Sequence, residues 1–173
     1  MTNPLEVMDQ GTLLTFDFDD ALRYHGPLAP GGVAHAYQVL ARGLQALGKN
    51  GPVERRDITV TTSHGGPGVR DTFELVTRAV TEGRYTVDGA LKRPERGRTM
   101  EIYVFRLDYR GESVTLVVRE GFVRDEYIAL SRKAARTAEE EARLVVVKQE
   151  MADRVMASPA GDVYDVVSSV GAA

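Results

Sequence analysis

Residues 57–71, DITVTTSHGGPGVRD, carry the two signals that decide the fold: a strand and a helix joined by a turn. β-Branched residues fill most of 57–62, and this pattern favours a strand. The glycines and the proline over 65–68 exclude regular structure at that point. A helix over 69–81 follows, because apolar residues recur there at helical spacing and a glycine ends the pattern: Val69, Phe73, Val76, Val80 and Gly83.

A similar unit lies upstream. The segment from Pro27 to Gly32 holds two prolines and two glycines, so it predicts a turn. A helix over 32–47 follows, with one apolar stripe that ends at Gly48: Val33, Tyr37, Leu40, Leu44 and Leu47. A short helix is expected over 16–23, where the acidic residues Asp17, Asp19 and Asp20 are interpreted as capping.

The second half of the chain predicts a hairpin and then helices. Strands are expected over 99–109 and 113–119, joined by a turn at Gly111. Residues 84–99 are predicted to be mostly loop. Helices are expected over 125–135 and 137–156, the second beginning with a capping box of Thr137 and Glu140. A short terminal helix is expected over 162–170.

These elements predict an α+β fold: a small mixed or antiparallel sheet packed with two central amphipathic helices, followed by a helical C-terminal third. The length of 173 residues suits a single domain over 1–173, with its core at about 16–167.

Composition excludes several classes of function. The formal net charge of −3 argues against a nucleic-acid partner, and a basic run (Lys92, Arg93, Arg96, Arg98) is interpreted as a solvated loop. The chain has no cysteine, so disulfides and thiolate metal sites are excluded. No apolar run is long enough for a membrane span, and no signal peptide is visible, so a cytoplasmic location is expected. No phosphate-binding or dinucleotide-binding glycine motif is present, so no nucleotide cofactor is expected.

The two turns are the candidate functional site. Each places a His-Gly pair, at His25 or His64, before the first turn of a helix, where backbone N–H groups are unpaired and attract anions. The glycines that would let a ligand approach those groups are Gly31, Gly32, Gly66 and Gly68. The imidazoles of His25 and His64 supply proton transfer. His35 lies two residues after Val33, and Asp71 lies two residues after Val69, so they occupy matching positions in their helices. Each side chain points either toward the same pocket or toward solvent. The alternative is that the glycines and prolines only make turns and the histidines only cap or pack.

A metal site is the sharper form of this hypothesis. His25, His64 and Asp71 offer the ligand types that zinc or iron prefers, although no local His-x-x-x-His signature brings them together.

The first turn, YHGPLAPG at Tyr24–Gly31, resembles the F-H-G-H-L-C-P-G motif of the FmdE-like domain family of formylmethanofuran dehydrogenase. GVRD at Gly68–Asp71 is similar to that family's C-x-x-D motif, and the resemblance extends in order over about 16–167. It implies an α+β domain, often paired as a homodimer, with a zinc-like metal near both motifs. His25 matches the family's first histidine, whereas Pro27, Ala29 and Gly68 stand where the family has a further histidine and cysteines. Either histidines such as His64 and His35 rebuild the metal site, or the site does metal-free acid/base or binding chemistry.

We therefore expect a small-molecule site for an anionic ligand at the two helix N-termini. If the protein is an enzyme, proton transfer of the lyase or isomerase type is expected. The alternative is a non-catalytic ligand-sensing or dimeric assembly module.

Overall fold

A five-stranded mixed sheet, with strand order β4-β3-β5-β6-β7, forms the centre of the protein in the computed structural model, which describes residues 3–170. The strands are β3 (Ile58–Thr62), β4 (Tyr85–Val87), β5 (Val104–Tyr109), β6 (Glu112–Val118) and β7 (Tyr164–Val170). β4 lies parallel to β3, and the other neighbours are antiparallel. The expected mixed sheet and α+β class are confirmed.

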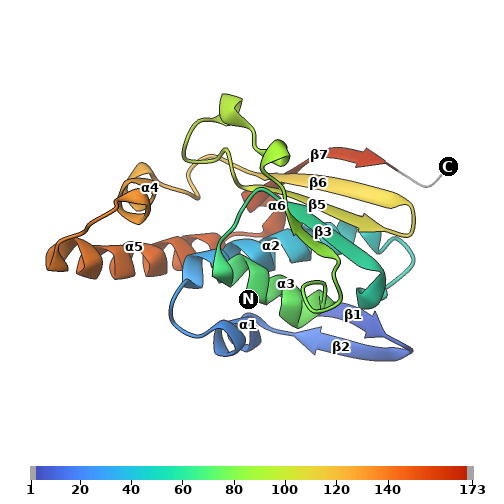
Figure 1. Ribbon diagram of the computed structural model, residues 1–173. Helices are drawn as coiled ribbons and strands as arrows, with labels where there is room; N and C mark the ends of the chain where they lie inside the picture. The colour runs from blue at the N-terminus through green and yellow to red at the C-terminus, as the bar shows by residue number, and fades with distance from the viewer. Residues whose placement is uncertain (1–2, 171–173) are drawn as a thin grey trace.

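Helices cover one face of this sheet (Figure 1). α2 (Pro30–Leu47) lies in the middle of the fold, where it contacts the sheet, α3 (Pro67–Thr77) and α5 (Ala138–Met156). Because the part from Val33 to Leu40 has neighbours on every side, its polar residues His35 and Gln38 are fully buried. α1 (Phe18–His25) packs on α2 and α3. The two central amphipathic helices predicted from the sequence are therefore confirmed.

α5 extends beyond the sheet, and α4 (Asp125–Arg132) packs on its projecting part (Figure 1). The expected capping box begins α5: the Thr137 hydroxyl accepts from the Glu140 N–H, and the Glu140 carboxylate accepts from the Thr137 N–H. None of the helices within residues 3–170 combines the length and apolar character that a membrane crossing needs.

Several expectations about the elements need correction. The strand expected over 99–109 begins only at Val104, because residues 99–102 form turns. The segment before α1 contains a hairpin of β1 (Leu5–Asp9) and β2 (Thr12–Phe16), joined by Gln10 and Gly11 with positive φ angles. Phe16 therefore ends a strand, and α1 begins after Asp17, whose carboxylate caps it in a capping box with Asp20.

The terminal helix expected over 162–170 is wrong, because only α6 (Ala160–Val163) is helical and β7 follows it. The β-branched residues of β7 complete an edge of the sheet by pairing with β6. The segment 84–99 contains β4 and two 3₁₀ turns (Gly89–Leu91 and Pro94–Arg96) in addition to loop.

Candidate functional site

His25 and Asp71 are brought together, as the sequence predicted. α1 ends at His25 because Gly26, with a φ of +84°, turns the chain away. The His25 Nδ1 atom then lies 2.8 Å from the Asp71 carboxylate at the start of α3. Arg70 donates to the other oxygen of that carboxylate. Burial acts to raise the pKa of Asp71, but the hydrogen bonds from His25 and Arg70 outweigh it and hold the pKa below its ordinary value.

The second ring nitrogen of His25 is free. Only 3% of the side chain is exposed, and its Nε2 atom is buried without a hydrogen-bond partner in the part of the chain that the structure describes. Because an ionised carboxylate only accepts hydrogen bonds, the shared proton sits on Nδ1, and the neutral form of this ring has its lone pair at Nε2. A free lone pair on a carboxylate-oriented imidazole is the arrangement of a general base, and a substrate reaches this buried Nε2 atom when the side chains that cover it move.

His64 is held in the opposite tautomer. Its Nδ1 atom accepts the Gly66 N–H at 3.0 Å, so the neutral ring carries its proton on Nε2. Gly66 makes this possible, since a Cβ there would lie 2.5 Å from the ring. The ring packs edge-on against Tyr103 at 4.7 Å between centroids. Burial lowers the pKa of His64 to about 4, so the ring is a neutral donor at neutral pH.

His35 lies on the other side of Tyr103. The expectation that it faces solvent is wrong, because it is fully buried. Its Nδ1 lies 2.8 Å from the Tyr164 hydroxyl, and its ring lies 4.8 Å from that of Tyr103. Burial, with smaller effects of His64 and Arg154, lowers its pKa to about 3. Tyr103 thus joins His35 and His64 into one aromatic cluster.

Three of the predicted ligand-binding glycines serve helix packing. A Cβ on Gly68 would lie 2.6 Å from the Ala29 carbonyl oxygen, and one on Gly31 would lie 2.9 Å from the Met151 sulfur of α5. A Cβ on Gly32 would lie 3.4 Å from the Val69 nitrogen. These glycines allow the first turns of α2 and α3 to meet and α5 to pack on α2, so the space above them is filled by the chain itself.

The residues do not fit the zinc or iron site that the resemblance implies. Within residues 3–170, no group of three or more His, Cys, Asp or Glu side chains is placed to hold a metal ion. Asp71 is engaged by His25 and Arg70, and the Nδ1 atom of His64 is engaged by Gly66.

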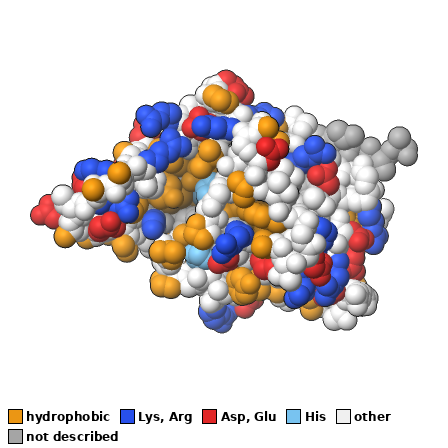
Figure 2. Space-filling view, viewed as in Figure 1, with side chains coloured by type: hydrophobic (Ala, Val, Ile, Leu, Met, Phe, Trp, Pro, Cys, Tyr) orange, Lys and Arg blue, Asp and Glu red, His pale blue; other side chains and the backbone are white. Residues whose placement is uncertain are grey.

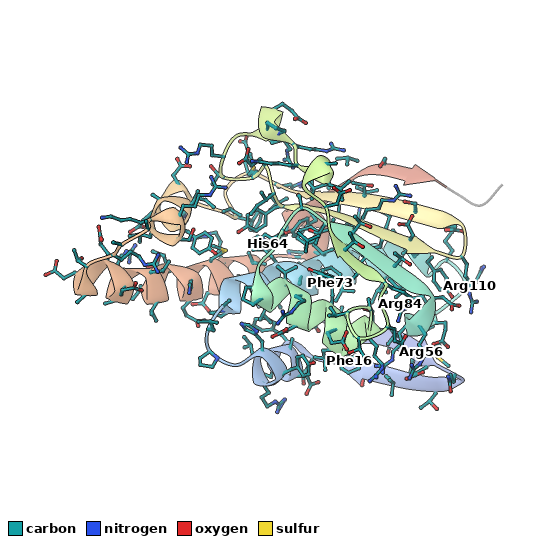
Figure 3. All side chains as sticks on the ribbon, viewed as in Figure 1. Phe16, Arg56, His64, Phe73, Arg84 and Arg110 are labelled. Carbon is teal, nitrogen blue, oxygen red and sulfur yellow. The ribbon has the colours of Figure 1, made fainter. Side chains whose placement is uncertain are left out.

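Histidine surface appears at two places on one face of the molecule, beside a hollow with hydrophobic walls (Figure 2). Because His35 is fully buried, this surface belongs to His25 and His64. His64 lies between the end of β3 and the start of α3 (Figure 3). Burial raises the pKa of Tyr103 well above its ordinary value. Two residues of α4 have smaller effects on that pKa: Tyr127 raises it and Arg132 lowers it. Sequence reasoning missed Tyr103 and Tyr164, because strand alternation marks Tyr103 only as a core residue and Tyr164 was placed in a helix.

No protein-family model matches this chain, and no curated protein matches it.

Proposed function

We propose that the protein binds a small anionic substrate on the histidine face and moves a proton on it, with His25 as the acid/base. The observation that carries this proposal is the buried, unpartnered Nε2 atom of His25 opposite the 2.8 Å contact with Asp71. Asp71 fixes the tautomer and the ring orientation, and it stabilises the imidazolium that forms when Nε2 accepts a proton. Asp71 is therefore a positioning residue.

His64 supplies the complementary group. Its Nε2–H is a neutral donor, and a neutral imidazole can polarise a carbonyl without giving up its proton. Histidine surface at two places on one face of the molecule supports a shared role of two imidazoles there (Figure 2). A donor aimed at the oxygen where negative charge develops stabilises an enolate. Burial, to which the contact with Tyr103 contributes, keeps the His64 ring in a dry, neutral environment.

These groups suit proton abstraction next to a carboxylate or carbonyl. The C–H electron pair would move into the carbonyl to form an enolate, and the proton would pass to the His25 Nε2 atom. The enolate oxygen would accept the His64 Nε2–H. Return of the proton to another carbon gives an isomerase, and loss of a leaving group from the next carbon gives a lyase.

Solvent exchange tests this without knowledge of the substrate. The protein is incubated in D₂O with a panel of 2-oxo, 2-hydroxy and unsaturated carboxylic acids, and deuterium incorporation at carbon is followed by ¹H NMR. His25→Gln is expected to abolish exchange, because the acid/base group is lost, and Asp71→Asn to reduce it by about 10²-fold or more, because the tautomer and orientation of His25 are no longer fixed. Asp19→Asn, an exposed change on the same helix as His25, serves as the matched control. Exchange that persists in His25→Gln would refute the role of His25.

A second candidate function, homodimeric assembly, is favoured by an apolar patch on the outside of α5. Leu28 is 64% exposed and Val145 is 66% exposed, and both line a groove of about 450 Å³ with Val146. Clustered apolar side chains of this kind mark contact surfaces. We propose that a second copy of the chain covers this patch. Val145→Glu is expected to convert a dimer into a monomer in sedimentation experiments, whereas Val87→Glu, an exposed change on β4, leaves the dimer intact. A wild-type monomer at high concentration would contradict the assembly.

A further inference from the structure

The β1–β2 hairpin forms a small sheet of its own, with a partly unpaired edge on the side of β1 away from β2 (Figure 1). In an antiparallel pair, successive residues turn their backbone N–H and C=O groups alternately toward the partner strand and away from it. Met8 turns its groups away from β2, because its N–H donates to the Val53 carbonyl at 2.8 Å. Glu6, two residues earlier in β1, therefore turns its N–H and C=O to the same side. Within residues 3–170, no backbone group of another segment bonds to them there.

The chain begins a third strand beside β1 but does not complete it. Glu54 forms an isolated parallel bridge with Met8. Because this bridge is parallel, the residues just upstream of Val53 would have to continue the strand beside Glu6. The chain turns away instead at Gly51, which has a φ of +117°. A groove of about 930 Å³, lined by Glu6, Gly51 and Val53 among others, lies where the third strand is missing.

The wall of this groove offers hydrogen-bond donors and acceptors side by side. The side-chain amides of Asn3 and Gln45 and the hydroxyl of Ser158 supply both kinds of group. A peptide likewise carries one donor and one acceptor on the main chain of each non-proline residue. The volume is at the upper end of the range of ligand sites, so a short stretch of peptide fits. The groove therefore matches a polypeptide backbone.

The two sides of β1 determine which side chains such a peptide needs. Leu5 is buried, whereas Glu6 is exposed. In a strand beside β1, the residue opposite Glu6 points to the side of Glu6, and its two neighbours point to the side of Leu5. Those neighbours meet the apolar part of the wall, which includes Leu44 and Met156. Glu6 is the only ionisable side chain among the described residues that line the groove, so it favours a basic residue opposite.

We propose that this groove binds an extended peptide segment of a partner protein, which adds a third strand to the hairpin beside Glu6. The segment has an apolar–basic–apolar pattern. Its backbone bonds to the N–H and C=O groups of Glu6 give affinity, and its alternate side chains give specificity. No histidine lines the groove, so this surface is independent of the proposed function of the histidine face.

Three peptides separate the backbone pairing from the side-chain contacts: N-acetyl-Val-Lys-Val-amide, the same peptide methylated at its three residue nitrogens, and N-acetyl-Val-Glu-Val-amide. Each is titrated into ¹⁵N-labelled protein, and the backbone ¹H–¹⁵N signals of Glu6, Ala41 and Gly48 are followed. The lysine peptide is expected to shift these signals with saturation. The methylated peptide is expected to cause no saturable shift, because it lacks the donors that a strand needs. The glutamate peptide is expected to bind at least about twofold more weakly, because like charges would lie opposite each other.

Variants at Glu6 test the backbone pairing and the charge separately. Glu6→Pro removes the N–H that faces the groove and keeps the hydrogen bonds between β1 and β2, so proline is tolerated there as on other edge strands. It is expected to abolish binding of the lysine peptide, as followed at Ala41 and Gly48. Glu6→Gln keeps the N–H and is expected to lose only the preference for lysine over glutamate. A preference that persists in Glu6→Gln would contradict the basic position of the pattern.

A variant on α2 tests the groove without a change in β1. Ala41 lines the groove, so Ala41→Leu adds bulk there and is expected to weaken binding of the lysine peptide. Ala90→Leu, an exposed change in the 89–91 turn, is the matched control and is expected to bind as the wild type does. The proposal is overturned if the lysine peptide causes no saturable shift, if the methylated peptide binds equally well, or if Glu6→Pro and Ala41→Leu both leave binding unchanged.

Discussion

Acidification from pH 7.5 to pH 5.0 is expected to cost this protein about 4 kcal/mol of unfolding free energy through two histidines. His35 and His64 are buried and neutral, with pKa values lowered to about 3 and about 4, whereas a histidine in the unfolded chain titrates near 6.5. Between those values the unfolded chain binds more protons than the folded one, so stability falls as the pH drops below 6.5. At pH 5.0 each histidine accounts for about 2 kcal/mol of that loss.

Urea unfolding at a series of pH values measures this dependence. In the His35→Gln variant the loss between pH 7.5 and pH 5.0 should fall to about 2 kcal/mol, whatever the absolute stability of the variant. The comparison is restricted to pH 5 and above, because most carboxylates of the unfolded chain protonate below that range. A wild-type stability that is flat from pH 7.5 to pH 5.0, or a slope that is unchanged in His35→Gln, would refute the assignment of buried neutral imidazoles.

Three further outcomes are expected in the same unfolding assay. Gly68→Ala should destabilise by about 1–3 kcal/mol, because the added Cβ meets the backbone of α2, whereas Gly89→Ala has open space and should change stability by less than about 1 kcal/mol. Tyr164→Phe should cost about 1–3 kcal/mol, because it leaves the Nδ1 atom of buried His35 without its partner; an unchanged stability would contradict that hydrogen bond. Thr137→Ala should cost about 1 kcal/mol through loss of the α5 cap, and Thr137→Ser should restore most of it.

Local signals predicted the parts of the fold that depend on neighbouring residues. The apolar stripe of α2 and the Thr137 capping box gave helices close to their observed bounds, because amphipathic spacing and capping are properties of a short window. The helix predicted over 69–81 ends earlier, at Thr77, because Arg78 takes a left-handed conformation and leaves Val80 outside the helix. The strand β7 was missed for the opposite reason. Its residues become a strand by pairing with β6, about fifty positions earlier in the chain, and no local pattern encodes that partner.

The site was predicted in part, for the same physical reason. The matching of Asp71 with the His-Gly turns anticipated the His25–Asp71 contact, since a helix start next to a helix end brings those side chains within reach. The exposure of His35 was predicted wrongly, because the prediction assumed that the helix face opposite the apolar stripe meets solvent. The part of α2 from Val33 to Leu40 is buried on all sides, so the residue opposite Val33 meets Tyr103 and Tyr164.

The hydrogen bond between His35 and Tyr164 joins residues 129 positions apart. While the ribosome is still making the chain, α2 therefore emerges long before the phenol that its imidazole needs. Until residue 164 has left the exit tunnel, the nascent chain holds an unsatisfied histidine and an uncovered strand β6, both of which invite wrong pairings. Pausing of translation or chaperone capture in that interval would consequently affect the yield of native protein more than the same event after β7 has docked.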